Sequence, residues 1–311
     1  MTMHTGAGDL QTTSQKMRVE WPTVALAAAC YGVWAACGVW LWPVMPVAAL
    51  IVMGVMVALH SSLVHECLHG HPTRDAALNE LLVALPLGLA WPYRRFKALH
   101  MKHHCDERLT DPFDDPESYY HALWAHEKMP RWFRFVLRVN NTLAGRIVLN
   151  PLLGTFGLVA SDIKLMLGRA RGVMDAWARH LAGAAVVAAI VTYGFGMPLW
   201  LYVLVPGWIG QSIIAVRTYA EHQWHKSAEG RTLIVERSPL SILFLNNNLH
   251  LVHHKMPSAA WYHLPKLFRE RRGEWLDMNG GYVFPNYLAL MRAHLFKGKE
   301  PVVHPQLRRE A

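Results

Sequence analysis

The sequence predicts an all-α integral membrane protein, with four transmembrane helices arranged as two hairpins, interfacial helices and a cytosolic helical cap. Composition is the first observation, since 52% of the residues are hydrophobic and only 17% are charged. That balance is too apolar for an ordinary soluble domain. The second observation is that nearly uncharged stretches of membrane-spanning length occur in two pairs. The third is that the basic residues avoid the two proposed outer turns.

Polarity divides the chain into three segments. They are a polar cytosolic N-terminus at 1–20, a membrane domain at 21–265 and a cytosolic C-terminal segment at 266–311. The N-terminal segment lacks a signal-peptide pattern, because the apolar stretch after it is too long and no small-residue cleavage site precedes a soluble domain. We expect this segment to be loose.

Four apolar stretches have the length of membrane spans. They cover residues of about 22–42, 46–64, 178–195 and 198–216. A tight turn containing Pro43 and Pro46 joins the first pair, and a turn from Gly194 to Pro198 joins the second. Each hairpin therefore returns the chain to the side of the membrane from which it entered.

Two further apolar segments are expected to lie at the membrane surface. Residues 76–92 are short and are interrupted by Pro86. Residues 147–167 carry Asp162 and Lys164, and charges within a span are costly. We therefore expect interfacial helices at both places.

The basic residues predict the orientation of the chain. Both outer turns lack Lys and Arg, and the 31 basic residues lie on the other side of the spans, apart from boundary residues such as Arg179. By the positive-inside rule, both termini and the histidine motifs face the cytoplasm. Topology thus explains the net charge of +9, and we expect no nucleic-acid partner.

Histidine motifs follow the apolar segments. The first is HxxxH, and the next two are HxxHH. Residues three and four apart share one face of a helix, so each motif directs two or three imidazoles to one place. With the histidine that follows the second hairpin, the candidate ligands are His65, His69, His100, His103, His104, His222, His250, His253 and His254.

Nine imidazoles are too many for one metal ion but fit two ions with four or five ligands each. Polar neighbours orient such ligands, because a metal-bound histidine usually donates its other N–H to a carboxylate or carbonyl. The candidates for this role are Glu221, Glu66, Asn246 and Asp114. Glu221 is equally explained as the partner of a nearby arginine, and the acidic turn from Asp111 to Glu117 as a solvated loop.

This set of motifs resembles the membrane fatty acid desaturase and hydroxylase superfamily. It combines HxxxH, two HxxHH motifs and the dipeptide Glu221-His222 after a transmembrane hairpin. The runs RTYAEH at 217–222 and NNNLH at 246–250 look like the bacterial branch, which implies a bacterial inner membrane. The resemblance implies a non-haem di-iron centre with the nine histidines as ligands and O2 as co-substrate. It also implies electrons from a separate ferredoxin-, rubredoxin- or cytochrome-type protein.

The resemblance implies a lipid-like substrate, and acyl desaturation is the first hypothesis. The motif from His65 to His69 is shorter than the HxxxxH of many acyl desaturases, and short motifs also occur in alkane hydroxylases and carotenoid-modifying relatives. A hydroxylase or ketolase acting on a carotenoid, an alkyl chain or a small molecule therefore stays open. We expect no catalytic residue beyond the metal site. The four cysteines form no CxxC pair, so no ferredoxin-type cluster is encoded.

A metal transporter is the hypothesis from another class of protein. It also explains histidines beside membrane helices. A transporter, however, places its ligands near the middle of the bilayer, between broken helices. Here the nine histidines lie at the ends of spans and in polar segments, which favours the enzyme. About two tightly held irons would support the enzyme, and exchangeable zinc would oppose it.

Overall fold

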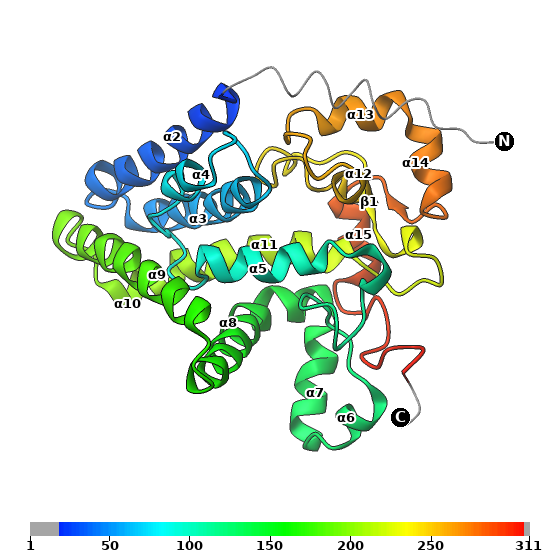
Figure 1. Ribbon diagram of the computed structural model, residues 1–311. Helices are drawn as coiled ribbons and strands as arrows, with labels where there is room; N and C mark the ends of the chain where they lie inside the picture. Colours follow the sequence, from blue (N-terminus) through cyan, green and yellow to red (C-terminus); the bar gives the residue numbers. More distant parts are fainter. Residues whose placement is uncertain (1–18, 308–311) are drawn as a thin grey trace.

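The computed structural model describes residues 19–307, which form a helical protein (Figure 1). The expected polar segment at 1–20 lies outside the described residues except for Val19 and Glu20. The long helices and the π-helical turns that extend them are α2 (Trp21–Ala36) with η1 (Cys37–Leu41), α3 (Pro46–Leu68), α8 (Leu143–Leu167), α9 (Arg171–Ala189) with η3 (Ile190–Gly194), and α10 (Leu199–Tyr202), η4 (Val203–Gly207) and α11 (Trp208–Glu221) in series.

Shorter elements connect the long helices and build the cap. They are α4 (Ala76–Leu82), α5 (Tyr93–His103), η2 (Asp106–Arg108), α6 (Leu123–Glu127), α7 (Arg131–Asn140), η5 (Glu229–Arg231), α12 (His250–Lys255), α13 (Leu264–Glu270), α14 (Arg272–Met278) and α15 (Tyr287–His294). Two short strands, β1 (Ile234–Val235) and β2 (Val283–Phe284), pair in parallel within the cap.

Within residues 19–307, five helices are long and apolar enough to cross a membrane, where the sequence predicted four spans. These helices indicate an integral membrane protein. The additional candidate is α8, which we expected to be interfacial because of its charges. Asp162 of α8 is fully buried and accepts hydrogen bonds from Arg95 Nε and Nη2 at 2.8–3.0 Å and from Trp177 Nε1 at 2.8 Å. Arg95, which is distant in sequence, pairs with this charge, so Asp162 is compatible with an α8 that crosses the membrane.

Helix boundaries follow local signals. Pro46 is the first residue of α3, where its missing N–H costs nothing. Asp75 caps α4 by accepting hydrogen bonds from the first-turn amides, and α4 ends at Leu82, so much of 76–92 is not helical. The second hairpin begins earlier than expected, because α9 starts at Arg171.

Close packing at glycines sets α3 beside α11. A Cβ on Gly210 would lie 2.3 Å from the Val57 side chain, and one on Gly54 would lie 2.5 Å from Ile209. Gly54 faces Ile209 and the later residue Val57 faces the later residue Gly210. Residue numbers therefore increase in the same direction along both helices, which run parallel. His65 and Glu221 each lie eleven residues beyond the glycine of their helix, or ~16 Å of helical rise. Both helices therefore deliver metal-site residues to the same level.

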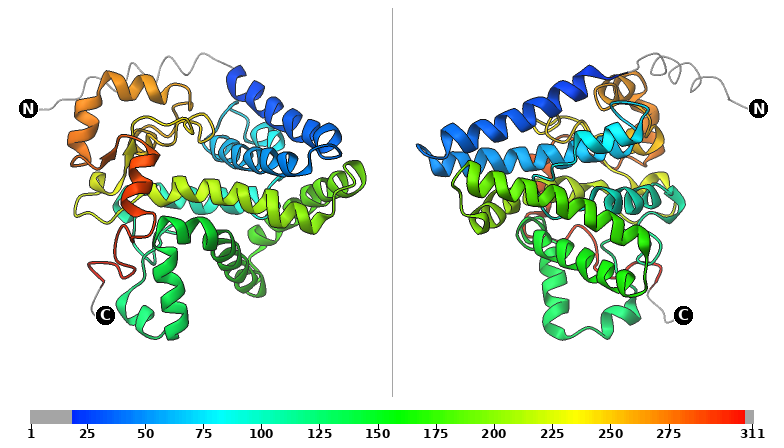
Figure 2. Two further views of the ribbon diagram at one scale, coloured as in Figure 1. Left: turned by 180° about the vertical axis from the view of Figure 1, so that it is seen from behind. Right: turned by 60° about the vertical axis from the view of Figure 1, so that its left-hand side comes forward.

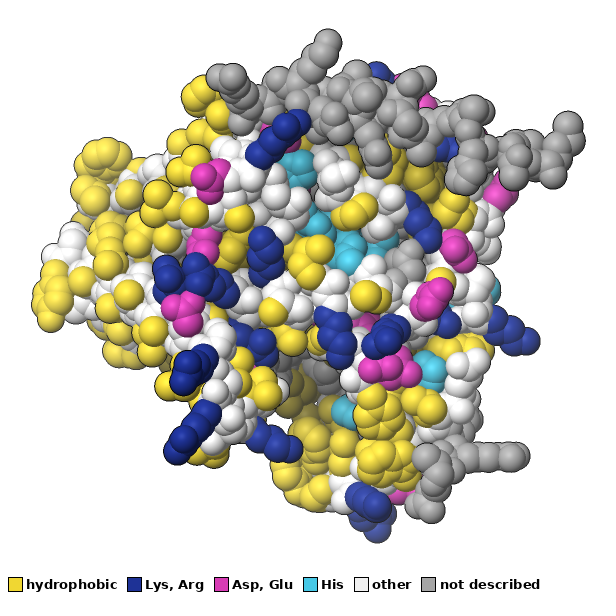
Figure 3. Space-filling model, in the orientation of Figure 1, with side chains coloured by type: hydrophobic (Ala, Val, Ile, Leu, Met, Phe, Trp, Pro, Cys, Tyr) yellow, Lys and Arg dark blue, Asp and Glu magenta, His cyan; other side chains and the backbone are white. Residues whose placement is uncertain are grey.

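The apolar hairpins occupy one end of the molecule and the cap occupies the other (Figures 1 and 2). Hydrophobic side chains cover the hairpin end, and charged side chains begin near the middle (Figure 3). Large apolar side chains are exposed at the hairpin tips, among them Trp40, Val44, Tyr193 and Trp200. An exposed apolar end bordered by charges is typical of a bilayer-embedded surface.

Candidate metal centre

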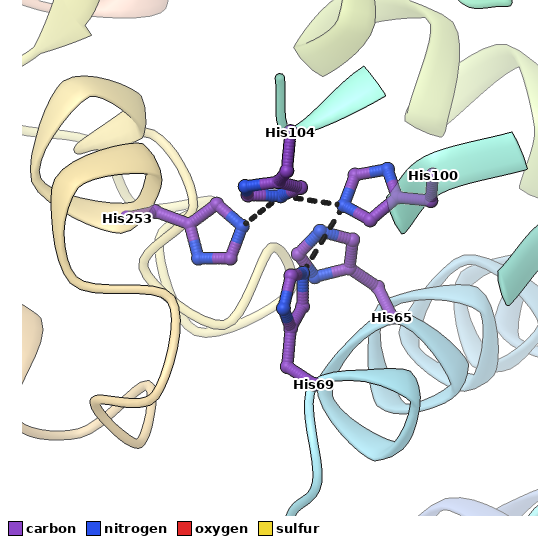
Figure 4. A group of neighbouring side chains, drawn as sticks. All are labelled: His65, His69, His100, His104 and His253. Carbon is purple, nitrogen blue, oxygen red and sulfur yellow. Dashed lines mark hydrogen bonds between the residues drawn. The ribbon is translucent and has the colours of Figure 1, made fainter. Parts of the chain in front are cut away.

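The nine motif histidines meet where α3, α5 and α11 end against the cap, and they form two clusters. The five-histidine cluster consists of His65, His69, His100, His104 and His253 (Figure 4). The four-histidine cluster consists of His103, His222, His250 and His254. Within each cluster the potential ligand nitrogens lie within 4.8 Å of one another. The structure thus brings all nine candidate ligands together.

Each HxxHH motif is divided between the two clusters. On an α-helix, residues i and i+4 differ by ~40° in direction, whereas i+3 lies ~60° to the other side. His100 and His104 accordingly join the five-histidine cluster and His103 joins the other. In α12 the division is reversed, since His253 alone enters the five-histidine cluster. One short helix therefore contributes histidines to both clusters, whereas the sequence led us to expect each motif to direct its imidazoles to a single place.

The facing nitrogens are close enough to share metal ions. Consecutive Nε2 atoms lie 3.1, 3.0 and 3.2 Å apart along the series His69, His100, His104 and His253. They lie 2.9, 3.0 and 3.2 Å apart along the series His103, His222, His250 and His254. Two nitrogens that bind one ion at ~2.1 Å and at right angles are ~3 Å apart. The separations fit metal ligation.

The second ring nitrogen of several histidines determines which nitrogen faces the neighbouring rings. Nδ1 lies 2.7 Å from Glu117 Oε1 in His100, 2.8 Å from Asp115 Oδ1 in His103 and 2.9 Å from Asn247 Oδ1 in His250. Each of these oxygens accepts a hydrogen bond, so Nδ1 carries the proton and Nε2 presents a lone pair. Lone pairs facing one another at about 3 Å repel unless a cation lies between them. The donor set therefore fits bound metal.

Burial favours the ligand form of most of these imidazoles. Burial and then the neighbouring imidazoles lower the pKa of five ligands outside the spans: His69, His104, His222, His250 and His253. Neutral imidazole is the form that binds metal. His103 differs, because burial lowers its pKa but the carboxylates of Glu117 and Asp115 raise it to about 9. Those carboxylates stabilise positive charge at His103, whether from a proton or from a metal.

The acidic turn contacts the clusters through residues other than Asp114. Asp114 is exposed and lies 3.6 Å from Arg108. Asp111 accepts hydrogen bonds from the amides of Phe113 and Asp114, which closes a turn and leaves Asp114 outside it. Asp115 is directed inward, where it contacts His103 and accepts a hydrogen bond from the Thr110 amide at 2.8 Å. The orienting carboxylates are therefore Asp115 and Glu117.

The Asn run also contacts the site through a neighbour of the expected residue. Asn246 has a positive φ of 55° and donates its side-chain N–H to the Trp261 carbonyl, which fixes the loop. Asn247 Oδ1 accepts the hydrogen bond from His250. The run of three asparagines at 246–248 indicated that a side-chain amide orients a histidine. The run alone does not show which of the three amides points toward the site.

The two glutamates next to ligands differ. Glu221 is buried and lies 2.8 Å from Arg217 Nε, so it is the partner of an arginine. It also lies 3.7 Å from His250 Nδ1, which is too far for a hydrogen bond. Glu66 is directed elsewhere, since its Oε1 accepts a hydrogen bond from the Trp261 amide at 2.9 Å. It belongs to a separate buried group with Glu20 and His71. Glu66 therefore supports the chain beside the site rather than a ligand.

A cavity of about 750 Å³ adjoins the four-histidine cluster. Glu117, Glu221 and His222 line it on the metal side. Phe96 and Leu153 are among its apolar lining residues, and the Phe96 ring lies 5.5 Å from the His100 ring. No single motif in the sequence indicates this cavity, because residues from distant helices form its wall.

Comparison with known proteins identifies the family. The model of the fatty acid desaturase family matches residues 40–286, which is most of the chain. No curated protein sequence matches the chain. The protein belongs to the fatty acid desaturase family, which confirms the resemblance inferred from the histidine motifs.

Proposed function

We propose that this member of the fatty acid desaturase family is an O2-dependent oxidoreductase that attacks an unactivated C–H bond of a lipid-like substrate. The nine histidines hold two iron ions, and acyl desaturation is the first expected outcome. The observation that carries the proposal is one cavity bounded by both His222 and apolar residues of the long helices. Bound iron supplies the activation of O2.

The chain itself positions the substrate and keeps water away. Residues of two long helices face the cavity at helical spacing, and they include Leu153 and Leu158 of α8 and Ile214 of α11. An apolar chain bound between these faces lies with one part beside His222. The apolar wall excludes water from the site, which limits side reactions of the oxidant with water.

Expression in a host of known lipid and pigment composition tests this function. Mass spectrometry should show a lipid that has lost two hydrogens, whereas a gain of oxygen would indicate hydroxylation or ketolation. The purified protein should hold about two irons per chain, because two clusters of ligands are present. The His253→Ala variant should form no product. His225→Ala is the matched control, because His225 is exposed and belongs to neither cluster, and it should keep activity.

We also propose that the metal centre and both termini face the cytoplasm of a bacterial cell. The uncharged hairpin tips and the charged opposite end support this orientation. A separate ferredoxin-, rubredoxin- or cytochrome-type protein then delivers electrons from the cytoplasm.

Cys105 offers a direct test of orientation. It is exposed and follows His104 at once, whereas Cys30, Cys37 and Cys67 are buried. A membrane-impermeant maleimide should label the protein in inverted vesicles and not in intact spheroplasts. Cys105→Ser should remove the labelling, and labelling in intact spheroplasts would contradict the orientation.

A further inference from the structure

Arg146, in the first turn of α8, is a buried cation without an anion. Its side chain is 3% exposed, and its Nε donates a hydrogen bond to the Asn140 carbonyl at 3.0 Å. Its Nη1 is buried and has no hydrogen-bond partner, and within residues 19–307 no carboxylate pairs with it. A buried guanidinium normally has a partner, because leaving it unpaired is costly.

Aromatic rings accommodate the guanidinium without neutralising it. The ring centroid of Tyr119 lies 3.4 Å from Arg146 Cζ, and that of Tyr219 lies 5.6 Å away. Stacking of this kind stabilises the flat face of an arginine. Tyr119 also makes a side-chain hydrogen bond with Arg146, so the partnerless Nη1 is the group left for an anion.

The neighbouring charges leave a positive excess. Lys299 Nζ donates hydrogen bonds to the carbonyls of Tyr219 and His222, so it adds a second cation to this wall of the cavity. Glu300 is the nearby carboxylate, and it already accepts hydrogen bonds from the Tyr120 hydroxyl and the Trp224 amide. Glu221 and Glu117 also line the cavity, but Glu221 pairs with Arg217 and Glu117 with His100. Arg146 and Lys299 therefore face Glu300 as two cations against one carboxylate, which favours an anionic ligand.

The same cavity continues from this polar end along an apolar face. Arg146, Asn150, Leu153 and Leu158 lie on the side of α8 that lines it. From the first to the last of these residues the helix rises by ~18 Å. Along that length the side chains change from charged to polar to apolar. The Asn140 amide lines the polar end, and its Oδ1 is also buried without a partner. Rotation of that amide would present its NH2 group to the same anion.

We propose that Arg146 anchors the carboxylate of the substrate, so that the enzyme acts on an amphiphile with a free carboxylate. This inference rests on the proposed function and specifies its substrate class. A carboxylate accepts charge-assisted hydrogen bonds from the free edge of the guanidinium, and the apolar chain follows α8. A neutral ester or a carotenoid would leave Arg146 unpaired.

Ligand binding to the purified protein tests the anchor without catalysis. Hexadecanoate, its methyl ester and hexadecyl phosphate are compared in a neutral detergent by ligand-induced change in melting temperature. The wild-type protein should bind hexadecanoate most tightly. Arg146→Gln should weaken that binding by at least ~30-fold and leave the weak binding of the ester unchanged. Arg131→Gln is the control, because Arg131 is exposed on α7 and lies outside the cavity.

Three outcomes would overturn the anchor. They are equal binding of acid and ester by the wild type, unchanged binding of the acid by Arg146→Gln, and tighter binding of hexadecyl phosphate than of hexadecanoate. If Arg146→Gln does not fold, Arg146→Lys can be used instead. It keeps the charge but loses the planar guanidinium that binds a carboxylate through two N–H groups, so it should bind the acid with intermediate affinity. Arginine-dependent binding without any oxidised product would refute the proposed function alone.

Discussion

The two histidine clusters are built from the same side chain but are held in different ways. In the four-histidine cluster, Nδ1 of His103 faces Asp115, Nδ1 of His250 faces Asn247, and Nδ1 of His222 lies 3.2 Å from the Arg231 carbonyl. In the five-histidine cluster, the comparable contact is between His100 and Glu117. His104 Nδ1 and His65 Nε2 are buried without hydrogen-bond partners. Hydrogen bonds orient one cluster more than the other.

The origin of the ligands explains this difference. Four members of the five-histidine cluster are two pairs at i, i+4 on α3 and α5, so helix geometry already aligns them. The four-histidine cluster includes His222, which follows α11 in extended conformation, and two ligands of the six-residue helix α12. Short and irregular segments need hydrogen bonds to hold a ligand in place. The comparison indicates that the five-histidine cluster depends on the number and helical alignment of its ligands. The four-histidine cluster depends on hydrogen bonds that orient its ligands.

The largest expected effect comes from removing one ligand from each cluster. His250→Ala leaves three imidazoles in the smaller cluster, whereas His69→Ala leaves four in the larger one. Activity should fall by more than ~100-fold in both variants, because a lost ligand costs at least as much as a lost orienting partner. Iron should fall toward one per chain in His250→Ala and less in His69→Ala. Elemental analysis and product mass measure both, and equal iron loss would remove the proposed difference.

The next effect concerns the orienting carboxylate. Asp115→Asn replaces a charged acceptor at His103 by a neutral one, and the affinity for iron should fall by ~10- to 100-fold. Asp114→Asn is the matched control, because Asp114 is exposed and pairs with Arg108. Release of iron to a chelator gives the affinities. Similar release from the two variants would show that the contact between Asp115 and His103 has no role in holding iron.

The histidines could be chosen from the sequence, because helical spacing fixes which side chains share a face. The choice between Asp114 and Asp115 could not, since the closing of the acidic turn by Asp111 decides which carboxylate turns inward. Asn246 and Asn247 present the same difficulty. Asn246 takes a left-handed backbone conformation, and a single sequence gives no sign of it.

The fifth candidate span, α8, was not expected from the sequence for a related reason. The two hairpins were recognisable because their spans contain almost no charge. The sequence of α8 shows Asp162 and Lys164, and it does not show that Asp162 pairs with Arg95 from a distant helix. Long-range pairing changes the cost of a charge in a span. The cavity, and the place of Arg146 in its wall, could not be predicted from the sequence for the same reason. Residues distant in sequence form the wall of the cavity.

The smallest expected effect separates two adjacent asparagines. Asn247→Ala removes the neutral acceptor at His250, but Glu221 Oε1 lies 3.7 Å from the same Nδ1 and can replace it. Iron affinity should therefore fall only about 10-fold, at the low end for an orienting partner. Asn246→Ala should leave iron affinity unchanged and lower the free energy of unfolding by ~1–2 kcal/mol, through a lost hydrogen bond and a strained positive φ. Chelator release and thermal melting distinguish the two. If Glu221 is the reserve acceptor, adding Glu221→Gln to Asn247→Ala should lower affinity by more than the two single effects combined, and simple additivity would contradict this role.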